Sequence, residues 1–199
     1  MFSLAMVLVV LAYTWVVEPI APRWMRYVPT VVVTGLIVWR AVKTREWGLK
    51  RSEFLPALRW AALFTGAGAL AIYLAGRSLG TWHDRRDVLG NLGALLPWAW
   101  GQQLAVQTVL LPEAQARVSK PGGIWLAALV FGALHLPNPF LAPVTCLAAL
   151  VWCRIYDRHP NLIPLALSHA ILSLVILYAF DDAITGRLRV GAAYLALTP

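Results

Sequence analysis

The chain has 199 residues, of which 60% are hydrophobic and 13% are charged, and its formal net charge is +8. A soluble domain is nearer half apolar and carries about twice as many charges, so the composition excludes an ordinary soluble domain and indicates one integral membrane domain. The positive charge is scattered through short connections. This pattern favours contact with membrane lipids at their anionic headgroups and no nucleic acid partner.

A helix needs about 20 apolar residues to cross the hydrocarbon of a bilayer. Hydropathy predicts an all-α, polytopic transmembrane bundle of about seven spans, with six or eight as alternatives. The predicted spans are residues 2–20, 27–42, 58–76, 88–111, 123–136, 140–156 and 162–180. We expect the first to be a retained helix, because no positively charged region precedes it.

The spans divide the chain into an N-terminal pair (1–44), a core (45–180) and a tail (181–199) that either packs on the bundle or lies in the interface. Basic and aromatic residues around 43–58 predict a segment along the headgroups. Ten of the 17 Lys and Arg residues fall in the second, fourth and sixth connections, which favours a cytoplasmic N-terminus. We expect a multi-pass protein of a bacterial inner membrane.

Prolines set two of the predicted boundaries. Pro112 is expected to close the fourth helix. Pro137 forces the chain to turn just after His135, because the residue before a proline avoids helical geometry.

Three glutamines interrupt the fourth predicted helix. Gln103 and Gln107 are four residues apart and share a face, with Gln102 about 100° round the helix. Strongly polar side chains at membrane depth mark a functional site by default. Hydrogen bonding between helices is the alternative that needs no function.

Two histidines lie at membrane depth, His135 at the end of the fifth helix and His169 within the seventh. A neutral imidazole is a good zinc ligand and a good general base, so the two histidines and the glutamines predict a shared polar pocket. His83 and His159 lie among charges and are expected to be solvated loop residues. Cys146 and Cys153 are about 10 Å apart along one helix, too far for a mutual disulfide.

The stretch from Gln102 to Ser173 resembles the core of the CPBP family, which groups the type II CAAX prenyl proteases with bacteriocin-processing and self-immunity proteins. That family has a Glu-Glu pair with an Arg four residues on, then Phe-x-x-x-His, then His-x-x-x-Asn or Asp. Phe131 and His135 match the middle motif, and His169 follows at a family-like distance. The resemblance covers roughly residues 45–180 and implies an intramembrane endopeptidase fold.

The chain departs from the family pattern at four positions. Gln102 and Gln103 replace the glutamates, Gln107 replaces the arginine, and Ser173 replaces the last Asn or Asp. In the family a glutamate activates water, whereas a carboxamide cannot take up a proton. Losing the carboxylates and the arginine together leaves a neutral cluster that costs less to bury.

We therefore predict a pseudoprotease with no cofactor, which binds a membrane-associated polypeptide or a prenylated segment. The family-equivalent positions are Gln102, Gln103, Gln107, His135, His169 and Ser173. One alternative is an active protease in which His135 or His169 is the base, Gln102 or Gln103 orients water, and Zn²⁺ binds weakly at the two imidazoles. Another alternative is a membrane scaffold that binds a small molecule.

Other carboxylates are candidates to replace the missing glutamates. Glu113 has an arginine, Arg117, four residues on, but it lies about 15 Å along the helix from Gln103. Asp84 and Asp87 are close enough in sequence to fold inward before the fourth helix, although nothing in the pattern indicates that they do.

Overall fold

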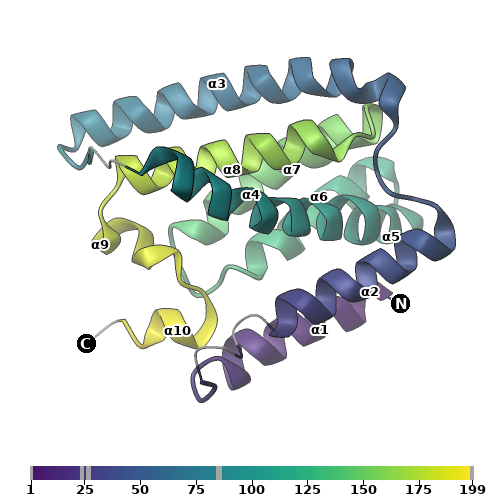
Figure 1. Ribbon diagram of the computed structural model, residues 1–199, viewed down its shortest axis with the longest axis horizontal. Helices are drawn as coiled ribbons and strands as arrows, with labels where there is room; N and C mark the ends of the chain where they lie inside the picture. The colour runs from purple at the N-terminus through teal and green to yellow at the C-terminus, as the bar shows by residue number, and fades with distance from the viewer. Residues whose placement is uncertain (1, 23–24, 26–27, 84–86, 198–199) are drawn as a thin grey trace.

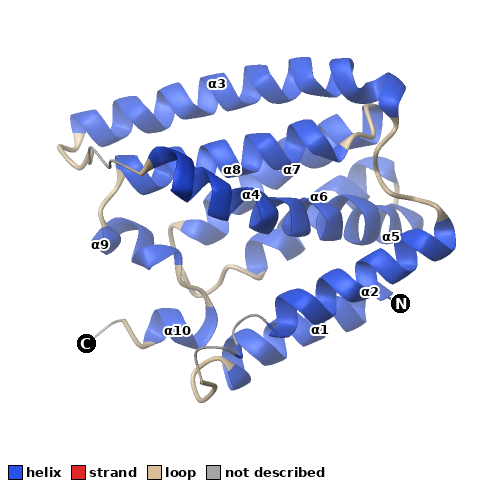
Figure 2. Ribbon diagram, viewed as in Figure 1, coloured by secondary structure: helices blue, strands red, loops and turns tan. Residues whose placement is uncertain are grey.

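The computed structural model describes residues 2–22, 25, 28–83 and 87–197, and in this part of the chain helices joined by loops form the fold, with no strand (Figure 2). The α-helices are α1 (Phe2–Ala12), α2 (Val28–Thr44), α3 (Phe54–Ser78), α4 (Val88–Ala105), α5 (Leu111–Arg117), α6 (Lys120–Ala133), α7 (Leu141–Arg158), α8 (Leu162–Ala179), α9 (Asp182–Thr185) and α10 (Gly191–Leu195). Two π-helical turns, η1 (Tyr13–Val17) and η4 (Val106–Leu110), continue α1 and α4, and the 3₁₀ turns η3 (Arg51–Glu53) and η5 (Gly186–Leu188) complete the elements. The predicted all-α fold class is confirmed.

A helix occupies each of the seven predicted apolar segments. Two of them, Arg51–Ser78 and Leu162–Ala179, are long and apolar enough to cross a membrane by length and composition. The apolar helices Phe2–Val17 and Lys120–Ala133 are shorter. The number of spans therefore stays a prediction, while the positions of the helices agree with the hydropathy pattern.

Helix α8 lies at the centre of the bundle, packed between α3 and α4, while α6 pairs with α7 (Figure 1). Small side chains bring α3 close to α8. Ala57, Ala61 and Thr65 recur every four residues on one face of α3 and are buried. At Gly76 a Cβ atom would meet the backbone of Ala179. Small residues allow helix backbones to approach closely, which drives helix association where lipid is the solvent.

The outer face of α3 is apolar and exposed. Leu63, Leu70 and Leu74 have exposed fractions of 66%, 57% and 55%. An exposed apolar strip of this kind marks a surface that lipid or another apolar partner covers. It fits a helix that faces the hydrocarbon of a membrane on one side.

The C-terminal tail packs on the loop that follows His135. Asn138 is fully buried, and its amide nitrogen donates to the carbonyls of Thr185 at 2.8 Å and Arg189 at 2.9 Å. The backbone amide of Gly191 donates to the carbonyl of Leu136 at 2.9 Å. Of the two placements considered for the tail, the structure shows the one against the bundle, where the tail fixes the loop that carries His135.

Candidate functional site

The helix that carries the glutamines does not end at Pro112, contrary to the sequence prediction. Helix α4 continues through η4 and α5 as far as Arg117. Pro112 has no N–H group to give to the carbonyl of Thr108, the acceptor four residues before it. The Arg40 guanidinium of α2 donates to that carbonyl at 2.6 Å. A neighbouring helix thus supplies the donor that the proline lacks, and the helix continues.

The π-helical turn η4 lies at this place, and its register differs from that of α4. The amide of Leu111 donates to the carbonyl of Val106, five residues before it. All five residues of η4 are buried, Gln107 among them. Single π-helical turns within α-helices are frequently found at functional sites.

Three polar side chains form one buried hydrogen-bonded chain across α4, η4 and α8. The Gln107 amide nitrogen donates to the Gln103 oxygen at 3.1 Å, and the Gln103 amide nitrogen lies 3.3 Å from Nδ1 of His169. The exposed fractions of Gln103, Gln107 and His169 are 1%, 0% and 3%. The structure therefore brings the fourth and seventh predicted helices together at these residues.

The hydrogen-bond partners assign different tautomers to the two histidines. Nδ1 of His135 lies 2.7 Å from the carbonyl oxygen of Phe131, which only accepts, so this nitrogen carries the proton and Nε2 is left as an acceptor. Nδ1 of His169 accepts from the Gln103 amide as that amide is oriented, so its Nε2 carries the proton. One imidazole thus offers a lone pair and the other offers an N–H group.

Aromatic rings enclose the two imidazoles. The ring of Phe131 lies edge-on to both, with centroids 4.9 Å from His135 and 6.2 Å from His169. The rings of Trp152 and Trp98 lie 4.6 Å and 5.3 Å from His169. The two histidines that were predicted to share a pocket therefore both lie beside the ring of Phe131.

A second polar group next to His169 was not expected from the sequence. The Ser168 hydroxyl lies 2.7 Å from the Thr65 hydroxyl of α3 and accepts from the indole nitrogen of Trp152 at 3.0 Å. Thr65 also donates to the carbonyl of Ala61. The available signal was that Trp152 lies in the middle of an apolar segment, where an interfacial anchor is out of place.

Gln102 and Ser173 are near the cluster in sequence: Gln102 precedes Gln103, and Ser173 follows His169 by four residues. Both are partly buried. In the described part of the chain, no hydrogen bond joins either side chain to the imidazoles. The side-chain oxygens of Gln102 and Gln107 are buried and have no hydrogen-bond partner within the same residues. These two acceptors are the unsatisfied polar atoms of the site.

Two of the alternative carboxylates lie away from the cluster. Glu113 contacts Ser3 in the first turn of α1, accepting from its hydroxyl at 2.7 Å, and pairs with Arg117 at 3.2 Å. Burial raises the pKa of Glu113, but the hydrogen bonds from Ser3 and Arg117 together outweigh this and hold it below 4.5. Asp87 is exposed and caps the start of α4 by accepting from the Gly90 amide. Asp84 lies outside the described residues.

The other two histidines also lie away from the cluster, each beside a carboxylate. His159 lies 3.0 Å from Glu53, and His83 contacts Asp181. The pKa of Glu53 is lowered, mainly by its hydrogen bond with His159. These pairs join the two ends of α3 to the two ends of α8. His83 is an exposed loop residue as expected, whereas His159 is partly buried. Cys146 and Cys153 are free thiols.

The donor set of the cluster does not suit zinc. A catalytic zinc site has three protein ligands and one open position. No group of three His, Cys, Asp or Glu side chains that could hold a metal occurs within residues 2–22, 25, 28–83 and 87–197. Nδ1 of each imidazole already has a partner, and the nearest further side chains are neutral amides. What the cluster offers is hydrogen-bond donors and acceptors without formal charge.

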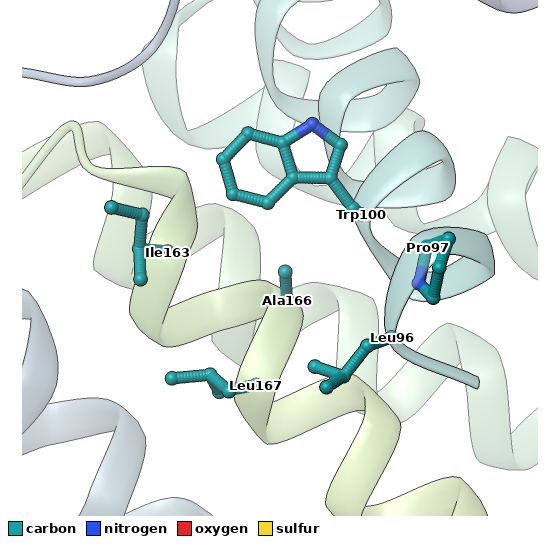
Figure 3. A pocket seen from close by; sticks show the side chains of 6 residues that line it. All are labelled: Leu96, Pro97, Trp100, Ile163, Ala166 and Leu167. Atoms are coloured by element: carbon teal, nitrogen blue, oxygen red, sulfur yellow. The ribbon is translucent and has the colours of Figure 1, made fainter. Parts of the chain in front are cut away.

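An apolar groove of about 300 Å³ lies between α4 and α8 (Figure 3). Two of its lining residues, Trp100 and Ala166, precede Gln103 and His169 by three residues each. Its lining residues are Leu96, Pro97, Trp100, Ile163, Ala166 and Leu167. The first three come from α4 and the others from α8. Ile163 and Leu167 are 38% and 37% exposed, so the groove is open at the surface of the bundle.

A family model described as type II CAAX prenyl endopeptidase Rce1-like matches the chain over residues 3–175. The match contains every residue of the cluster. It also contains α1 and α2, which precede the stretch that carries the motif resemblance. No curated protein and no solved structure matches the chain.

Proposed function

Since the chain belongs to the type II CAAX prenyl endopeptidase Rce1-like family, whose members are helical and membrane-embedded, we propose that it is a multi-pass pseudoprotease of a bacterial inner membrane. It binds a membrane-associated polypeptide or a lipidated segment and leaves the peptide bond intact. The single observation that carries this proposal is the uncharged chain of Gln107, Gln103 and His169 at the position of the family's charged motif.

Hydrolysis of an amide by water needs a group that takes up a proton near working pH. The amides of Gln103 and Gln107 cannot do so, and their hydrogen bonds fix them as donors to their neighbours. A neutral site still supports binding, because buried acceptors gain most when a ligand supplies the missing donor. The unpartnered oxygens of Gln102 and Gln107 are such acceptors.

The groove between α4 and α8 supports a lipidated ligand. Its lining is apolar and its opening lies on the face of two apolar helices, so an isoprenoid or acyl chain can enter it directly from the hydrocarbon. The polypeptide attached to that chain then lies beside lining residues that precede Gln103 and His169 by three positions. Small-molecule sites are commonly apolar clefts with a few polar groups that fix orientation.

The test is photo-crosslinking of the purified protein with a farnesylated peptide that carries a benzophenone. We expect the intact peptide to crosslink to α4 or α8, and we expect Ala166→Phe, which fills the groove, to abolish the crosslink. Leu70→Phe on the exposed face of α3 is the matched control and should leave the crosslink unchanged. Equal labelling of wild type and Ala166→Phe would remove the proposal.

One observation favours a second candidate function, an active hydrolase. Because Nδ1 of His135 carries its proton toward Phe131, Nε2 is an unprotonated base. In this candidate, His135 takes the proton of a water molecule that Gln102 or Gln103 orients. Cleaved peptide that disappears in His135→Ala, or zinc at a stoichiometric level in the purified protein, would favour the hydrolase. Binding of a small polar solute with no peptide crosslink would favour the scaffold.

A further inference from the structure

We propose that one end of the bundle is a binding surface for anionic phospholipid headgroups. We call this end the basic face. It is the right-hand end in Figure 1, where the loop between α2 and α3, helix α5, the turn between α7 and α8, and the N-terminus lie. This inference does not depend on the function of the glutamine–histidine cluster.

Hydrogen bonds show that these segments form one continuous surface. The Lys50 amide donates to the Pro160 carbonyl at 3.1 Å, and the Leu162 amide donates to the Gly48 carbonyl at 2.8 Å. The Gln115 side chain of α5 donates to Asp157 of α7 at 2.7 Å. The basic connections that looked scattered along the sequence are therefore adjacent in the fold.

The basic face carries an excess of positive charge. Its ten cations are Arg40, Lys43, Arg45, Lys50, Arg51, Arg59, Arg117, Lys120, Arg154 and Arg158, and its four carboxylates are Glu46, Glu53, Glu113 and Asp157. Each carboxylate already has a partner within the protein. Glu46 pairs with Arg40, and Glu53 pairs with Lys50 and His159. Glu113 pairs with Arg117, and Asp157 accepts a hydrogen bond from Gln115. The internal carboxylates therefore leave most of the cations without a counter-charge.

Seven of the ten cations are exposed and have no carboxylate partner within the part of the chain that the structure describes. They are Lys43, Arg45, Arg51, Arg59, Lys120, Arg154 and Arg158. The described residues of the opposite end differ. There Arg187 and Arg189 pair with Asp182 and Glu18, and of the three cations only Arg77 has no such partner. Among the residues that the structure describes, the cations without a carboxylate partner are thus concentrated at one end.

Exposed apolar and aromatic side chains border the cations. Trp47, Leu49, Leu55 and Trp60 have exposed fractions of 43%, 38%, 61% and 55% and lie on the same loop and the first turns of α3. Tryptophan at the ends of membrane helices lies at headgroup level, with its ring toward the acyl chains. A nucleic acid offers phosphates without an apolar phase beside them, so this border favours a lipid surface.

The energetics follow from charge and position. A Lys or Arg near an anionic membrane surface contributes about 1 kcal/mol to attraction, which corresponds to about a fivefold change in affinity. Because the exposed cations lie at the surface, salt screens them, with a Debye length of about 10 Å at 0.1 M and 3 Å at 1 M. The preference for anionic lipid is therefore expected to fall with ionic strength.

The test uses the full protein in a mild detergent and pyrene-labelled phosphatidylglycerol or phosphatidylcholine with the same acyl chains. Energy transfer from tryptophan to pyrene reports binding. We expect the wild type to bind phosphatidylglycerol at least about tenfold more tightly at low salt, and we expect Lys43→Gln, Arg51→Gln and Arg158→Gln together to lower that ratio by about tenfold or more.

The matched control removes the same number of charges from the opposite end, with Arg77→Gln, Arg187→Gln and Arg189→Gln. It should keep the preference for phosphatidylglycerol, and gel filtration with thermal unfolding reports whether either variant remains folded. Equal binding of the two lipids by the wild type, or equal losses in both triple variants, would overturn the proposal. So would salt-sensitive binding of a single-stranded oligonucleotide without any preference between the lipids.

Discussion

Replacing Arg40 with methionine removes the donor that satisfies the carbonyl of Thr108, where Pro112 offers no N–H group. The hydrogen bond is 2.6 Å long, and Thr108 is 3% exposed. A hydrogen bond from a charged donor contributes about 1.5–3 kcal/mol. Because the Arg40 side chain is 18% exposed, some solvation is regained in the variant. We therefore expect the free energy of unfolding to fall by about 2 kcal/mol.

A loss of that size lowers the unfolding temperature of a chain of about 200 residues by about 4–8 °C. Thermal unfolding in detergent, followed by circular dichroism, measures it. Arg77→Met is the control, because Arg77 is exposed and has no carboxylate partner among the described residues. It should shift the unfolding temperature by less than about 2 °C, as expected for a surface substitution.

A second substitution isolates the role of the proline. In Pro112→Ala the new amide can donate to the carbonyl of Thr108, so Arg40→Met should destabilise this background much less than the wild type. The difference is the coupling free energy of a double-mutant cycle. The reasoning is refuted if Arg40→Met has the same effect in both backgrounds, or no larger an effect than Arg77→Met.

Gly76→Ala places a Cβ atom 2.5 Å from a backbone carbonyl oxygen of α8 and should destabilise by about 1–3 kcal/mol. Gly66→Ala on the same helix meets nothing within 4 Å and should not destabilise. Ser168→Ala leaves the buried indole N–H of Trp152 without an acceptor and should cost about 1–3 kcal/mol in chemical unfolding, whereas an unchanged midpoint would contradict this contact. The pKa of Glu113 is held below 4.5 in the folded protein. Its stabilisation is therefore present above about pH 4.5 and lost as the pH falls through the folded-state pKa, so Glu113→Gln should reduce the acid-induced fall in unfolding temperature. An equally steep fall in both proteins would exclude Glu113 as a source of this fall.

The hydrophobic runs predicted the helices well, because a segment of about 20 apolar residues has few other stable states in a membrane. The family-like spacing of the motifs placed Gln103 and His169 in one cluster, where the structure has them 3.3 Å apart. The turn after His135 followed from the restricted geometry before Pro137. The helices and the turn depend on local sequence, and the cluster was predicted from the spacing of the motifs along the chain.

The features that the sequence did not predict depend on contacts between distant helices. Pro112 was expected to end a helix, and nothing nearby in the sequence shows that Arg40, 72 positions earlier, supplies the missing donor. Nothing near Trp152 in the sequence shows that its ring lies against His169 and that its indole nitrogen donates to Ser168. Tertiary packing decides such partners, and local propensity carries no signal for them.

A cluster without a carboxylate should bind a peptide without cutting it, and an assay for cleavage of a farnesylated peptide ending in a CAAX sequence tests this most directly. Mass spectrometry of the product compares purified wild type with His135→Ala over the same incubation. We predict no product above the background that His135→Ala gives. Steady cleavage by the wild type that His135→Ala abolishes would contradict the account.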